Sequence, residues 1–234
     1  MARDSQLAFA FRSHGGKRKG AGRPAKGIKA GVSHLRRPAL SRHHPVHVTL
    51  RSAAGVPSLR NARLFEKVRL ALAAGRERFG FRLVHFSVQS NHLHLIAEAQ
   101  DAHALSLGMQ GLSVRVARAV NRVLARRGRL FADRYHPRAL KSPRAVHFAV
   151  RYVLLNARKH QTSAPGFIDD CSSAPWFGGF VRPDELAFGA AQTRERWRSS
   201  SGVEAPVVPA QSWLLRHSTR RYGGFDIDDT PGTD

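Results

Sequence analysis

The stretch VHFSVQSNHLHLIAEA (Val84–Ala99) decides how the rest of this sequence is interpreted. Its apolar residues alternate as in a buried β-strand, and a polar break at 89–91 divides it into two strands that can pair as a hairpin. Side chains two residues apart share one face of a strand, with Cα atoms about 6.6 Å apart. His92 and His94 therefore point the same way, so one strand carries two imidazoles on one face.

Strand and helix patterns alternate on both sides of this hairpin. The segment 130–140 contains Pro137, which cannot donate a ladder hydrogen bond and therefore places its strand at an edge of the sheet. A shorter helix is expected at 185–198. In chain order we expect a strand at 45–51, a helix at 59–78, strands at 81–88 and 92–99, a helix at 104–126, a strand at 130–140 and a helix at 143–158.

This order predicts an α+β fold with a ferredoxin-like layout. The sheet would have four antiparallel strands, with the helices packed on one face and a C-terminal helix that carries Tyr152. In that topology the first and third strands are central and the second and fourth lie at the edges. The edge position required by Pro137 agrees with this arrangement.

The charge of the chain indicates a polyanionic partner. Lysine and arginine together number 39 against 16 acidic residues, which gives a formal net charge of +23 and a pI near 11.7. Solubility requires far less charge, so the expected partner is nucleic acid, with a membrane surface as the weaker alternative.

The expected compartment is the cytoplasm. No apolar run approaches the ~18 residues of a membrane helix, and the apolar patch near the N-terminus is too short for a signal peptide. We therefore expect no membrane partner. The single cysteine, Cys171, excludes an intrachain disulfide and a cysteine-based zinc site, which fits a reducing compartment.

Composition divides the chain into three parts. Residues 1–42 hold eleven basic side chains and one acid, which predicts a disordered DNA-binding arm. Residues 43–160 contain the strands and helices described above. Residues 161–234 form a loop-rich extension with an acidic tail that we expect to be mobile.

The basic arm carries the candidate phosphate contacts Lys17, Arg18 and Arg23. The tripeptide Gly22-Arg23-Pro24 looks like an AT-hook, in which an extended arginine enters the narrow minor groove. A generic phosphate-binding arm is the alternative interpretation.

The last predicted helix adds two polar groups four residues apart. Tyr152 and Asn156 are neighbours on one helical face, so they can supply a nucleophile and a third oxygen ligand beside the two histidines. Each residue also has a structural interpretation. The histidine face can simply be solvated, Tyr152 can be a boundary aromatic, and Asn156 can cap the helix.

The spacing of NHLHLI, about 60 residues, and RYVLLN resembles the HUH single-tyrosine transposases of insertion sequences, and most closely their relatives, the REP-associated tyrosine transposases. The resemblance covers about 44–160. It implies that His92 and His94 are metal ligands, that Tyr152 is the nucleophile, and that Asn156 completes the metal site. The family often has proline where this chain has Ser90 and Ala157.

The resemblance implies a DNA transposase, a single-strand endonuclease that nicks and rejoins single-stranded or hairpin DNA through a 5′ phosphotyrosine. A tyrosine with a pKa near 10 is a poor nucleophile at neutral pH, so Mg²⁺ or Mn²⁺ is the expected cofactor. Arg134 and Arg138 are candidate contacts to the DNA backbone. The family usually works as a homodimer, and some members act as monomers.

Two other functions fit the same residues. The first is a non-catalytic DNA-binding protein on the same scaffold, and the second is a metal-dependent RNA-processing enzyme. Salt-dependent binding without cleavage would indicate the first, and dependence on the 2′-hydroxyl without a tyrosine adduct would indicate the second.

Overall fold

The computed structural model describes residues 39–160, 166–181 and 183–229. These residues belong to one compact unit. Lys17, Arg18 and Arg23 of the basic arm lie outside the described residues. The division of the chain at residues 42 and 160 stays a prediction.

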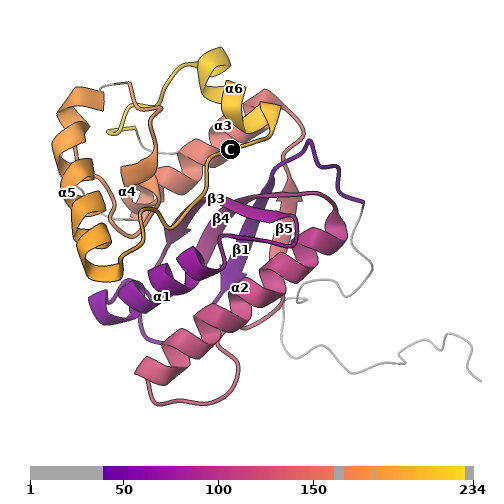
Figure 1. The fold of residues 1–234 in the computed structure, drawn as a ribbon, viewed down its shortest axis with the longest axis vertical. Coiled ribbons are helices and arrows are strands. Elements are labelled where there is room, and N and C mark those ends of the chain that lie inside the picture. Colours follow the sequence, from indigo (N-terminus) through magenta and orange to yellow (C-terminus); the bar gives the residue numbers. More distant parts are fainter. Residues whose placement is uncertain (1–38, 161–165, 182, 230–234) are drawn as a thin grey trace, which may run out of the picture. The chain divides into compact units, whose positions relative to one another are not determined.

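The centre of the fold is a five-stranded sheet in the order β2-β3-β4-β1-β5, with all neighbouring strands antiparallel (Figure 1). The α+β class and the central position of β1 and β4 are therefore confirmed. Pro137 lies in β5, which pairs with β1 alone, as an edge strand should. The strands are β1 (Val46–Arg51), β2 (Glu77–Arg78), β3 (Phe81–Val88), β4 (His92–Ala99) and β5 (His136–Ala139).

The prediction of four strands was wrong by one short strand. The first helix, expected to run to residue 78, ends at its C-cap Gly75, so the next residues can turn back and pair with β3 as β2. The turn is made by Phe79 and Gly80, which both have positive φ angles, of 52° and 75°. Such turns match the twist of an antiparallel hairpin.

Side-chain caps begin the main helices. Asn61, Asp101 and Ser142 each accept a hydrogen bond from a backbone N–H of the first turn of α1, α2 and α3. Within the described part of the chain, no helix is both long and apolar enough to span a bilayer. The helices are α1 (Ala62–Ala74), α2 (Ala102–Val123), α3 (Pro143–Leu154), α4 (Asn156–His160), the 3₁₀ turn Ala174–Trp176, α5 (Pro183–Ser201) and α6 (Trp213–Tyr222).

Helices cover both faces of the sheet, so the expectation of helices on one face was wrong. Leu93 and Leu95 of β4 belong to a core with α1 and α2, which we call the first face. Ile96 belongs to a separate core with Val150 and Val153 of α3. Helix α3 lies on the opposite side of the sheet from α1 and α2, which we call the second face (Figure 1). The adjacent Leu95 and Ile96 point to opposite faces, and both are fully buried. A strand that is apolar on both faces requires cover on both.

The C-terminal extension completes the cover of the second face. The backbone N–H of Ser173 donates to the carbonyl of Phe86 at 2.9 Å, and the N–H of Val208 donates to Leu83 at 3.0 Å. The tail expected to be mobile is instead anchored where it is described, because Phe225 is buried in the second core. Helix α6 had no counterpart among the predicted elements.

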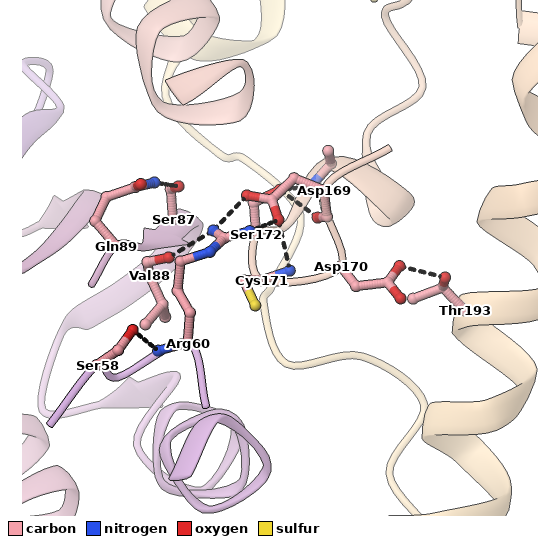
Figure 2. Close-up of polar contacts among 11 residues, drawn as sticks. Ser58, Arg60, Ser87, Val88, Gln89, Asp169, Asp170, Cys171, Ser172 and Thr193 are labelled. Atoms are coloured by element: carbon pink, nitrogen blue, oxygen red, sulfur yellow. Dashed lines mark hydrogen bonds and ion pairs between the residues drawn. The ribbon is translucent and has the colours of Figure 1, made fainter. Parts of the chain in front are cut away.

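A buried ion pair ties this extension to the sheet and to the start of α1 (Figure 2). Arg60 donates to both carboxylate oxygens of Asp169, at 2.7 and 3.0 Å, and to the carbonyl of Val88 at 2.9 Å. Asp169 is buried and also accepts the backbone N–H of Cys171 at 3.0 Å. Removing one partner would leave the other charge buried without compensation.

We expect Asp169→Ala to lower the free energy of unfolding by about 3–5 kcal/mol in urea denaturation. Glu66→Ala is the matched control because it breaks an ion pair with Lys67 in which both side chains are exposed. That substitution should cost about 1 kcal/mol or less. Equal effects of the two substitutions would contradict the anchoring role of the Arg60–Asp169 pair.

His85 of β3 is half-buried and lies against the extension. Its Nδ1 lies 3.4 Å from the Ser173 hydroxyl, and its ring meets the edge of Phe177 with centroids 5.6 Å apart. Burial lowers the pKa of His85 from 6.5 to about 4. The folded protein therefore binds this proton more weakly than the unfolded chain does, so the stability is complete above pH 6.5 and decreases as the pH falls toward 4.

At pH 5 the lowered pKa of His85 should cost up to about 2 kcal/mol of stability relative to pH 7. We expect His85→Gln to reduce the loss of unfolding free energy between these two pH values, measured by urea denaturation. His103→Gln, at an exposed histidine of α2, should leave that loss unchanged. If His85→Gln behaved like His103→Gln, the buried neutral histidine would not be the cause.

Candidate functional site

The two histidines of β4 converge at the start of the strand. The Nε2 atoms of His92 and His94 lie 2.9 Å apart, and the ring centroids lie 4.6 Å apart. His92 is half-buried and His94 is buried. The shared face predicted from the two-residue spacing is therefore present, on the second face of the sheet.

Tyr152 of α3 lies against this pair. Its ring meets the ring of His94 edge-on, with centroids 5.1 Å apart, and its centroid lies 6.0 Å from that of His47. The helix is fixed here because Val150 and Val153, on either side of Tyr152, belong to the second core. The structure thus brings together the tyrosine and the two histidines, whose chemical roles stay predictions.

Asn156 does not share a continuous helix with Tyr152, so the predicted helix 143–158 was wrong at this point. Helix α3 ends at Leu154, Leu155 forms a turn, and α4 begins at Asn156. All residues of 153–157 are buried, whereas a straight helix on a protein surface exposes part of every turn. The helix is thus interrupted at Leu155, within the segment where the chain passes from the surface into the interior.

The side chain of Asn156 is fully buried, and neither of its amide atoms has a hydrogen-bond partner among the described residues. Buried amides are almost always paired in folded proteins. No hydrogen bond therefore joins this amide to His92 or His94. Its assignment as a metal ligand stays a prediction.

Two further residues of the site were missed because strand alternation identified them only as the polar side of the first strand. His47 Nε2 lies 3.2 Å from His94 Nδ1, and Thr49 Oγ1 lies 3.3 Å from the same atom. The antiparallel register of β1 and β4 places Thr49 opposite His94. Only the pairing of strands from distant parts of the chain reveals these contacts.

His47 is neutral at physiological pH. Burial lowers its pKa from 6.5 to about 4, and the positive charges of Arg138 and His136 on β5 contribute. In the register of β5 against β1, Arg138 lies opposite His47. The side chain of Arg138 is exposed and borders the histidine cluster.

The second candidate backbone contact, Arg134, is not on the strand as expected. Strand β5 begins only at His136, so the predicted strand 130–140 was too long and Arg134 lies in the preceding loop. This side chain is exposed. The binding of DNA by Arg134 and Arg138 stays a prediction.

The hydrogen bonds around the two histidines of β4 indicate where their protons lie. Asn91 Oδ1 lies 2.7 Å from His92 Nδ1, and an amide oxygen can only accept, so His92 Nδ1 carries the proton. A neutral His92 then presents an unprotonated Nε2 to His94. His94 Nε2 donates across the 2.9 Å separation, and His94 Nδ1 accepts from Thr49 or His47.

The pair of imidazoles could also bind a metal ion. Imidazole nitrogen is a common metal ligand, and the Nε2 atoms of His92 and His94 are close enough that both could bind one ion once His94 Nε2 has lost its proton. Among the described residues, no group of three or more His, Cys, Asp or Glu side chains is arranged to hold a metal ion. A metal at this pair therefore needs a further ligand of another type, such as an amide oxygen or phosphate.

Comparison with known proteins gives a similarity in fold to solved structures. No protein-family model and no curated protein matches the chain. A solved structure of a REP-associated tyrosine transposase bound to a REP hairpin is similar with 15% sequence identity and a TM-score of 0.44, over 55% of this chain and 74% of that one. That protein is of the family whose motifs the sequence resembles.

In the metal-free protein we expect His92 to be protonated on Nδ1 and His94 on Nε2. Long-range ¹H–¹⁵N NMR spectra of the histidine rings at pH 7 measure this directly. Asn91→Ala should weaken the preference of His92 for protonation on Nδ1, because it removes the oxygen that accepts this N–H. A His92 ring protonated on Nε2 in the unmodified protein would contradict the assignment.

Proposed function

We propose that this chain is a transposase-type nuclease that nicks and rejoins one strand of single-stranded or hairpin DNA, with Tyr152 as its nucleophile. The observation that carries the proposal is the convergence of the Tyr152 ring on His94 and, through it, on His92. These residues come from α3 and β4, and both elements are fixed by packing in the second core. A tyrosine held against two histidines suits attack on a phosphate bound by the histidine cluster.

The reaction requires the following exchange of bonds. The Tyr152 oxygen attacks a backbone phosphorus in line, a tyrosine–phosphate bond forms, and the bond from phosphorus to the 3′ oxygen breaks. The phenol loses its proton, and the departing oxygen gains one to become a 3′ hydroxyl. Attack by another 3′ hydroxyl reverses these changes and joins the strands, because the covalent intermediate keeps the energy of the broken bond.

His92 and His94 are the residues that would hold the divalent ion, Mg²⁺ or Mn²⁺, with Asn156 as the proposed third ligand. When bound, such an ion polarises the scissile phosphate and offsets charge on the departing oxygen. Thr49 and His47 hold the His94 ring through Nδ1, so its Nε2 stays directed at His92.

The proposed substrate follows from charge and access. The net charge of +23 attracts a polyanion, and the exposed guanidinium of Arg138 lies beside the histidine cluster, where it can bind a backbone phosphate. Tyr152 and His92 are only half-buried, so the site opens to the surface. A flexible single strand or a hairpin end brings its phosphate into such a site more readily than a continuous duplex.

A labelled hairpin oligonucleotide incubated with Mn²⁺ should give a covalent protein–DNA adduct that survives denaturing electrophoresis. Tyr152→Phe should abolish the adduct and retain DNA binding, because only the hydroxyl is lost. Tyr222→Phe is the matched control, since Tyr222 is an exposed tyrosine of α6, and it should keep the adduct.

An adduct that persists in Tyr152→Phe would overturn the assignment of the nucleophile. Salt-sensitive binding with no adduct in any metal would instead indicate a non-catalytic DNA-binding protein. Cleavage of the RNA hairpin alone, without a tyrosine adduct, would indicate an RNA-processing enzyme.

A further inference from the structure

An open hollow of about 560 Å³ lies at the end of the sheet away from the two histidines. Its lining comes from the end of β4, the turn between β2 and β3, the segment before β1 and the start of α6. Glu98 of β4 lines it and lies six residues along the strand from His92, about 20 Å at 3.4 Å per residue. The hollow is therefore separate from the candidate active site.

Two large aromatic side chains of this hollow are exposed. Phe79 is 69% exposed and Trp213 is 58% exposed, although burial of such side chains normally contributes to folding. The guanidinium of Arg78 lies 5.4 Å from the centre of the Phe79 ring, and the Trp213 ring stacks on His217 at 4.9 Å. Exposed flat rings near guanidinium groups are surfaces on which unpaired bases stack.

The backbone conformation at Phe79 independently indicates that this exposed aromatic has a function. This residue has a φ of 52°, in the left-handed region where a bulky side chain is an outlier. Glycine, asparagine and aspartate are preferred at such turn positions. The chain thus places a large exposed aromatic where it is conformationally unfavourable, and strain of this kind concentrates at functional sites.

The charges of the hollow favour an anionic ligand. Its two carboxylates are already engaged, because Arg82 pairs with Glu77 and Glu98, and Glu98 also accepts the backbone N–H of Ser212 at 2.6 Å. Arg42 and Arg78 also line the hollow, and neither forms an ion pair with another described residue. Three arginines and two glutamates line the hollow, so its net charge is positive by one.

We propose that this hollow binds unpaired bases of single-stranded nucleic acid, which stack on Phe79 and Trp213 while Arg42 and Arg78 contact the flanking phosphates. The proposal does not require Tyr152 to be a nucleophile. The straight separation of this hollow from the histidines equals about six stacked nucleotides at about 3.4 Å each. Because Ile96 is buried beneath α3 between the two places, a strand that reaches both must pass around α3 and be longer than this.

Fluorescence anisotropy with labelled dT15 and a 15-base-pair duplex tests the proposal on the full-length chain. The double variant Phe79→Gly/Trp213→Ala should weaken dT15 binding by at least about 10-fold, since each stacked base contributes about 1–3 kcal/mol. Duplex binding should change by less than about 2-fold, because paired bases are unavailable for stacking. Glycine removes the strain at residue 79, so loss of folding is not the expected cause.

Phe188→Ala is the matched control, since Phe188 is 74% exposed on α5 and lies outside the hollow, and it should leave dT15 binding unchanged. Trp213→Phe should retain the affinity and remove most of the tryptophan quenching by dT15. Equal weakening of dT15 and duplex binding, or a loss below 2-fold for dT15, would overturn the proposal. Neither result would alter the tyrosine adduct assay, so the two proposals fail separately.

Discussion

The rest of this structure depends on the burial of β4 on both faces. Every residue from Leu93 to Ala99 is buried, and adjacent residues of a strand point to opposite sides. A single layer of helices cannot cover such a strand. Helices α1 and α2 cover one face, and α3 with the C-terminal extension must cover the other. The tyrosine is carried to the histidines by the helix that supplies this second layer.

One face of β4 changes in character along its length, in steps of two residues. His92 and His94 form the polar cluster with His47, Ile96 enters the second core, and Glu98 accepts backbone N–H groups at the start of α6. Ile96, which lies between the polar cluster and Glu98, is fully buried and fixes α3 above the strand. A rigid strand of this kind can hold reactive groups at constant separation, which a loop does less well.

The same face therefore links the two places where we propose contact with nucleic acid. The histidine cluster lies where β4 begins, and the hollow with Phe79 and Trp213 lies where it ends. The extension joins both ends, because Arg60 and Asp169 hold it near the end of β3 and Glu98 holds it at α6. Residues that sequence composition indicated only as a loop-rich tail thus form part of the cover of the second face and one wall of the hollow.

The local pattern of the sequence was sufficient for the main elements and for part of the site. Alternation identified the strands and placed His92 and His94 on one face, and helical spacing placed Tyr152 on the helix after the Pro137 strand. The local pattern could not show that a second layer of helices covers Ile96, because an apolar residue in a strand does not identify the helix that packs on it. Nor could it identify β2, which exists only because α1 ends early and pairs its next residues with β3.

By itself, the sequence determined the charge, the order of four of the five strands and the pairing of two imidazoles, because each depends on residues close together in the chain. Only the tertiary structure decided that His47 and Thr49 hold His94, that the helix is interrupted before Asn156, and that the extension closes the second face. These features depend on strand register and on contacts between segments far apart in sequence. Neither periodicity nor composition records them.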